Sequence, residues 1–215
     1  MSEVHISVRG TAEGRYAAER ATVNARVALE DPDRETVRRR TLDVVERTQG
    51  GLGALAESGA VASWSADQVR VFAERPRKRG EPQPLVHHAR VSVRAEFVDF
   101  DALADWVSAL AAVDGVEVQG IGWDVEPEQR RAYEAEVRRN AVADAMAKAR
   151  AYADAIGRES VEPTQLADAG MLDGDQDDRP MTMAAAGGEP DRPRLRLKPR
   201  DIVVRVAVDA RFAAR

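Results

Sequence analysis

Three histidines are the first candidates for chemistry, because histidine binds metals and transfers protons near neutral pH. They are His5, His87 and His88, and the chain has no cysteine. His87 and His88 are neighbours in a strand-like segment, where adjacent side chains point to opposite faces. No pair has the HxH or HxxxH spacing of a metal site, and the lack of cysteine excludes disulfides and sulfur-based zinc sites. We therefore expect no metal and no other cofactor.

Four aspartates resemble the start of a calcium-binding loop, in which the first, third and fifth positions supply oxygen ligands. They are Asp173, Asp175, Asp177 and Asp178. The sixth position of such a loop is glycine but is Asp178 here, and the twelfth is glutamate but is Ala184 here. The surrounding residues 173–194 are rich in Asp, Gly, Pro and Ala and show no period. We therefore predict a flexible acidic loop rather than a calcium site.

The nucleophile and phosphate-binding motifs are incomplete. Residues 50–53, Gly-Gly-Leu-Gly, lack the lysine and the Ser/Thr of a P-loop and come late in a helical pattern. Ser58, Ser63, Ser65, Ser92 and Ser108 have no GxSxG setting, so a serine hydrolase is unsupported. We predict no catalytic, cofactor-binding or metal-binding residues and no enzyme activity. A small-molecule enzyme whose groups are dispersed over loops stays an alternative.

A basic loop is a candidate for binding. Residues 74–84 contain three prolines and the basic residues Arg75, Arg77, Lys78 and Arg79. Charges grouped in this way could dock on phosphate or on an acidic partner. The loop lacks aromatic residues for stacking bases, and the chain has a formal net charge of −5. We therefore regard nucleic acid as an improbable partner and interpret the loop as an exposed hairpin tip.

Membrane and export signals are not evident in the chain as given. No apolar run reaches the length of about 20 residues that crosses a bilayer. The first residues, Met1-Ser2-Glu3, lead directly into a strand-like pattern rather than into the apolar run of a secretory signal. We therefore expect a cytoplasmic protein.

The longest periodic stretch, residues 126–157, predicts a helix against which other elements pack. Pro127 suits a first turn, because its missing N–H needs no partner there, and Gly157 suits a helix end. The apolar positions recur every four residues and are mostly alanine: Tyr133, Val137, Ala141, Ala145, Ala149 and Ala153. Short side chains allow a close approach, so we predict that this face lies flat on a sheet.

The remaining pattern predicts two more helices and several strands. We expect helices over about 31–55, with Asp31 as the cap, and 101–113. Alternation predicts strands at about 4–8, 21–29, 64–73, 86–97, 116–125, 161–167 and 202–212. Gly10 should interrupt the first strand, a hairpin should join the first two, and the last strand should pair within the main sheet.

These elements give the order β-β-α-β-β-α-β-α-β-β. This order predicts an α+β fold with a largely antiparallel sheet covered by about three helices. At 215 residues the chain can bury a sizeable core, and we predict a single domain over residues 1–215.

Taken together, these motifs resemble the SIMPL-domain family. The resemblance begins at residues 6–10, Ile-Ser-Val-Arg-Gly, and continues through the strand at 21–29. It is strongest in residues 118–123, Val-Gln-Gly-Ile-Gly-Trp, and in the helix that follows them. The closing segment, Lys-Pro-Arg-Asp-Ile at 198–202, is also similar, although Arg200 stands where glycine is more usual.

The resemblance implies a role in binding or assembly rather than catalysis. Bacterial members include periplasmic oxidative-stress and immunogenic envelope proteins, some members form homo-oligomers, and one animal member associates with a signalling kinase. The family offers no catalytic residues to carry over. We therefore expect a non-enzymatic binding or self-assembling protein, with a homo-oligomer or another protein as partner and a stress-related role.

Overall fold

The computed structural model describes residues 3–78, 81–82, 84–172 and 197–215. The chain divides into two compact units, each with its own core. Unit 1 consists of Met1–Tyr16, Val125–Pro190 and Asp201–Arg215, and unit 2 of Ala17–Asp124 and Asp191–Arg200. The predicted α+β class and the three helices are confirmed, but the single main sheet is wrong, because the strands form two separate main sheets.

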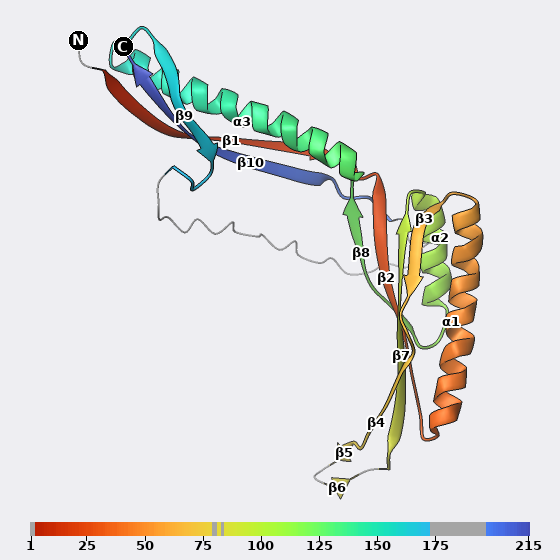
Figure 1. Ribbon diagram of the computed structural model, residues 1–215. Helices are drawn as coiled ribbons and strands as arrows, with labels where there is room; N and C mark the ends of the chain where they lie inside the picture. The colour runs from red at the N-terminus through yellow and green to blue at the C-terminus, as the bar shows by residue number, and fades with distance from the viewer. Residues whose placement is uncertain (1–2, 79–80, 83, 173–196) are drawn as a thin grey trace. The chain divides into compact units, whose positions relative to one another are not determined.

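Unit 2 is an antiparallel sheet with two helices on one side (Figure 1). Its sheet elements in chain order are β2 (Arg20–Asp31), β3 (Val61–Ala66), β4 (Arg70–Glu74), β7 (Val86–Phe97) and β8 (Val116–Asp124). The strand order is β3-β7-β2-β8, and β4 also pairs with β7. Two short strands, β5 (Arg77–Lys78) and β6 (Glu81–Pro82), pair with each other.

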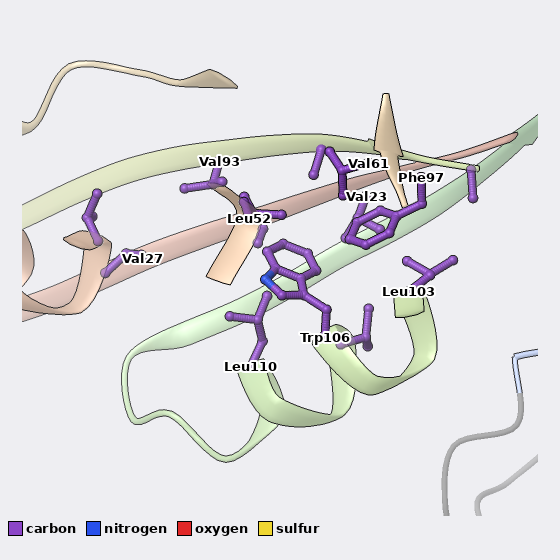
Figure 2. Packing of buried hydrophobic residues seen from close by; sticks show 14 of the residues in the cluster. Val23, Val27, Leu52, Val61, Val93, Phe97, Leu103, Trp106 and Leu110 are labelled. Atoms are coloured by element: carbon purple, nitrogen blue, oxygen red, sulfur yellow. The ribbon is translucent and has the colours of Figure 1, made fainter. Parts of the chain in front are cut away.

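The core of unit 2 lies between the buried face of the sheet and the apolar stripes of two helices. Alternate residues of β2 and β7 are buried, whereas α1 (Arg34–Glu57) and α2 (Phe100–Ala111) each bury one apolar stripe. Figure 2 shows Trp106 of α2 lying beside Phe97 of β7. The centroids of these two rings are 5.4 Å apart. Because the helices cover one face of the sheet, the other residues of each strand point away from this core.

Unit 1 is a three-stranded antiparallel sheet with one long helix along it (Figure 1). The strands are β1 (Val4–Tyr16), β9 (Val161–Asp168) and β10 (Ile202–Ala214), in the order β1-β10-β9. The helix, α3, spans Pro127–Ala155. Its buried residues are Val137, Ala141, Ala145, Ala149 and Ala153, so the predicted alanine face on a sheet is confirmed.

Several predicted strand connections and bounds, and one helix cap, differ from the structure because of the hydrogen bonds that the backbone makes. The first two strands do not form a hairpin, because β1 pairs with β10 and β2 pairs with β7 and β8. Gly10 does not end the first strand, which continues to Tyr16. The expected strand at 64–73 is two strands, β3 and β4, both paired with β7. The cap of α1 is Asp33 rather than Asp31, since the Asp33 carboxylate accepts the N–H of Thr36 at 2.8 Å.

Gly10 lies where β1 packs closely against α3. A Cβ built on Gly10 would overlap the carbonyl oxygen of Ala141 and would lie 2.8 Å from the Cβ of Ala145. The backbone of the helix cannot move away without losing the contacts of its alanine face. Glycine at this position therefore allows the close packing of α3 on β1.

Two side chains of α3 bind the outer edge of β1. The Asp144 carboxylate accepts the N–H of Thr11 at 2.8 Å and the Lys148 ammonium at 2.6 Å. Lys148 also donates to the carbonyl oxygen of Arg9 at 2.9 Å. These bonds satisfy backbone groups on the side of β1 away from β10, where edge strands are open to further pairing. The bond from Lys148, followed by that from Thr11, lowers the pKa of Asp144.

We predict that Gly10→Ala destabilises the protein by about 1–3 kcal/mol, because the added methyl group overpacks a rigid helix–strand contact. Urea denaturation measures the change. Gly50→Ala is the control, because Gly50 lies in α1 with nothing within 4 Å of a Cβ. It should instead stabilise by up to about 1 kcal/mol through helix propensity. A Gly10→Ala variant as stable as the wild type would contradict the packing argument.

We predict that Asp144→Asn lowers stability at neutral pH and that the difference shrinks in acid. The folded pKa of Asp144 is below its ordinary value, so its contribution is complete above the unfolded pKa and disappears as the pH falls through the folded pKa. Thermal melts from neutral to acidic pH test this dependence. Asp154→Asn is the control, since its exposed carboxylate near the C-terminus of α3 opposes the helix dipole. A loss that is independent of pH would refute the proposed role of the carboxylate.

Candidate binding site

The face of the unit 2 sheet that carries no helix is the candidate site, and we call it the open face. Strand alternation places Val91 and Val93 of β7 in the core and Arg90 and Ser92 on the open face. The register of the sheet then brings other residues beside them. Arg70 of β4 lies directly opposite Arg90, and Arg26 of β2 lies directly opposite Ser92.

A groove of about 430 Å³ lies on this face, and we call it the basic groove. Its walls come from β2, β4, β7 and the segment between β3 and β4: Arg26, Asp67, Gln68, Arg70, Phe72, Arg90 and Ser92. Three guanidinium groups and one carboxylate give it a formal charge of +2. The whole chain has a formal charge of −5, so the groove is a local concentration of positive charge.

Arg70 and Arg90 form a like-charged cross-strand pair. Residues directly opposite each other on antiparallel strands have Cβ atoms about 4.5–5.5 Å apart, and like charges at such positions are destabilising. Within the part of the chain that the structure describes, neither guanidinium has a carboxylate at ion-pair distance. Arg90 lies over the ring of Phe72, 5.0 Å from its centroid, which holds this guanidinium beside the groove.

Arg26 is held in place by an amide rather than by an acid. In the orientation that satisfies both groups, the amide oxygen of Gln119 on β8 accepts from Arg26 Nη2 at 2.7 Å and from Nη1 at 3.1 Å. A neutral acceptor orients the guanidinium without cancelling its charge. Arg26 is partly buried, in contrast to the exposed Arg70 and Arg90.

The histidines do not converge. His88 lies on the open face, where its ring stacks on Phe72 at 5.2 Å and its Nδ1 is 3.6 Å from Glu30 Oε2. His87 is the neighbour of His88 in β7 and therefore points to the other face, as predicted. His5 belongs to unit 1 and lies 3.9 Å from Glu3. Among the described residues, no three His, Asp or Glu side chains gather to hold a metal. The lack of a metal site in the whole chain stays a prediction.

The other sequence candidates are dispersed or lie outside the described residues. Residues 50–53 are part of α1, as their helical pattern predicts. Arg75 is exposed just after β4, and residues 77–78 form β5. Arg79 and the whole acidic loop at 173–194 lie outside the described residues, so the predictions made for them stay predictions. The basic groove itself was missed, although the alternation of Arg90 and Ser92 with valines was a visible signal.

A second hollow, of about 320 Å³, lies in unit 1 and is occupied by internal bonds. Arg9 donates from Nε to Asp209 at 2.7 Å, and the N–H of Gly170 donates to the same carboxylate at 2.6 Å. The Arg9 guanidinium is the main cause of the lowered pKa of Asp209. Arg9 and Asp209 neutralise each other in this hollow, and its second arginine, Arg211, donates to the amide oxygen of Gln165 and the carbonyl oxygen of Leu172.

Residues 6–212 match the sequence model of the family described as SIMPL, a protein of unknown function (DUF541). The chain belongs to the SIMPL family. The match includes residues of both units, and the assignment of the whole chain to a single SIMPL domain stays a prediction. No curated protein matches the chain. In this SIMPL chain, no described helix is both long enough and apolar enough to span a membrane.

We predict that Arg70→Glu stabilises the SIMPL chain by about 0.2–1 kcal/mol, because a like-charged cross-strand pair becomes an oppositely charged one. Urea denaturation at low salt measures the gain, which high salt should reduce. Arg94→Glu is the matched control, because Arg94 lies on the same face of β7 but opposite Asn24 and Ser65. Equal effects of the two substitutions would show that Arg70 and Arg90 do not repel each other.

Proposed function

We propose that this SIMPL-family chain is a non-enzymatic binding protein that holds a partner on the open face of unit 2. The partner is a second copy of the chain or another protein. The observation that carries the proposal is the Arg70–Arg90 pair in the basic groove. Stability alone favours opposite charges at such positions, so a like-charged pair points to a role in recognition.

The cross-strand pairs of unit 1 support this reasoning by contrast. Arg9 is opposite Asp209 and Glu13 is opposite Arg205, and both pairs form salt bridges, at 2.7 and 2.8 Å. The same chain therefore places opposite charges across strands where it builds structure. The like charges at Arg70 and Arg90 depart from its own pattern.

Binding fits the groove better than catalysis does. The carboxylate among its lining residues is Asp67 and the hydroxyl is Ser92, and both residues are exposed. A catalytic serine needs a base within hydrogen-bonding reach. His88 is four residues from Ser92 on the same strand, about 13 Å away, and it stacks on Phe72 and faces Glu30. An enzyme with dispersed groups remains the second reading, and this groove does not favour it.

Self-association is supported by the strand edges. In the described part of the chain, β8 has β2 as its strand neighbour and β9 has β10. Each strand therefore presents a second edge whose backbone groups can pair with another chain. The corresponding edge of β1 is occupied by Asp144 and Lys148 near Thr11, so β8 and β9 are the better candidates.

We predict that the chain forms an oligomer at high micromolar concentration. Size exclusion with light scattering measures the mass, at low salt and at high salt. A strict monomer under both conditions would contradict self-association and leave a different protein as the partner. The double variant Arg70→Ala/Arg90→Ala distinguishes assembly through the open face from assembly through the strand edges. It should weaken an assembly held by the open face and leave an assembly held by strand edges intact.

A further inference from the structure

We infer that the basic groove recognises an oxyanion, a phosphate or carboxylate group of its ligand, held between Arg70 and Arg90. The inference rests on the proposed function and names the chemistry that the open face recognises. Both guanidiniums come from strand residues in direct register, so the sheet fixes the positions of their Cα atoms. An oxyanion placed between them adds two attractions, which outweigh the repulsion between the two guanidiniums.

The residue type fits this ligand class. Arginine presents a planar fork of N–H donors that matches the paired oxygens of carboxylates and phosphates, and such charged bonds are stronger than neutral ones. Arg70 and Arg90 are directly opposite each other, and Arg26 is opposite Ser92, two residues further along β7, so all three arginines line one groove. Ser92 and Gln68 add a hydroxyl group and an amide group to the same walls.

The formal charge of the groove indicates how many negative charges a matching ligand carries. Three guanidiniums and the carboxylate of Asp67 leave a formal charge of +2, which one phosphate dianion or two carboxylates would balance. Asp67 would repel a more extended polyanion that passed over it. A ligand with one compact anionic group therefore fits better than a long nucleic-acid backbone.

The groove has space for more than the anionic group. Its volume of about 430 Å³ exceeds that of a single oxyanion, and its apolar wall is Phe72, a residue that is 39% exposed. The guanidinium of Arg90 lies over the ring of Phe72, so an apolar part of the ligand that packs on this ring would also contact Arg90. We therefore expect an oxyanion attached to a flat or apolar group to bind better than the free ion.

Like charges directly opposite each other depart from the other described strand pairs of this chain. Where two residues of fixed charge lie directly opposite elsewhere, their charges have opposite signs, as in Arg9 with Asp209, Glu13 with Arg205 and Arg26 with Glu117. The sequence has 37 acidic residues against 32 basic ones, so acids are plentiful. Among the described residues, Arg70 and Arg90 nevertheless face each other without one.

The test is a titration of the full chain followed by NMR of the arginine Nε–H groups. The probes are inorganic phosphate, phenyl phosphate and benzoate, each compared with chloride at equal ionic strength. We expect saturable shifts of the Arg70 and Arg90 signals, tighter binding of phenyl phosphate than of inorganic phosphate, and weaker binding as NaCl rises from about 50 to about 500 mM. Phosphate and benzoate together distinguish the two sources of the oxyanion.

Variants assign the binding to the groove. Arg70→Ala and Arg90→Ala should each weaken phenyl phosphate at least about fivefold, since each removes a charged hydrogen-bonding group. Arg70→Lys keeps the charge without the fork and should give an intermediate loss. Arg94→Ala removes an arginine from the same face of β7, outside the groove, and should bind like the wild type. Melting temperatures confirm that each variant is folded.

Several outcomes would overturn the inference. Shifts that do not saturate, that chloride reproduces, or that Arg94→Ala changes as much as Arg70→Ala would each show that no oxyanion site exists. Other results distinguish failure of this inference from failure of the proposed function. An assembly that Arg70→Ala/Arg90→Ala weakens, with no oxyanion binding, would keep the binding function and remove this ligand. Release of phenol from phenyl phosphate, lost in Arg70→Ala, would keep the oxyanion site and remove the non-enzymatic function.

Discussion

In each unit, one face of an antiparallel sheet is covered, by α1 and α2 in unit 2 and by α3 in unit 1, and this packing decides which strand residues are buried. One such contact is at Gly10, where the absence of a Cβ lets the backbone of α3 approach β1 closely. The alanine face then fixes the orientation of the helix, which brings Asp144 and Lys148 to the edge of β1. One small residue thus links the packing of the core to the protection of a strand edge.

The same constraint explains what could be predicted from the sequence. Periodicity predicts which face of an element is buried, so the alanine face of α3 and the alternation of β7 are both confirmed. Periodicity carries no information about which strand lies alongside. Arg9 and Asp209 are 200 positions apart in the chain and directly opposite in the sheet, and only the three-dimensional fold brings them together. The expected hairpin between β1 and β2 is wrong for this reason.

The basic groove could not be predicted from the sequence, because its residues are brought together by strand pairing. That Arg90 lies on the non-core face of its strand could be read from the alternation with Val91 and Val93. That Arg70 lies opposite Arg90 could not be read from the sequence. The segment at 64–73 has the pattern of one strand, whereas the break between β3 and β4 sets the register of Arg70 on β7. A charged cluster in sequence, such as that around Arg75, is easy to see. A cluster made by register alone is not.

Exposure explains how the fold tolerates the like-charged pair. Two unit charges about 4 Å apart interact by about 1 kcal/mol in bulk water but by about 4 kcal/mol at the effective dielectric near a protein surface. Arg70 and Arg90 are both exposed, and exposed charge pairs contribute only about 0.2–1 kcal/mol, which is small against a typical stability of about 5–15 kcal/mol. The same solvent weakens the attraction of the pair for any anion. An oxyanion alone should therefore bind weakly, and tight binding would require a larger partner whose other contacts exclude water from the open face.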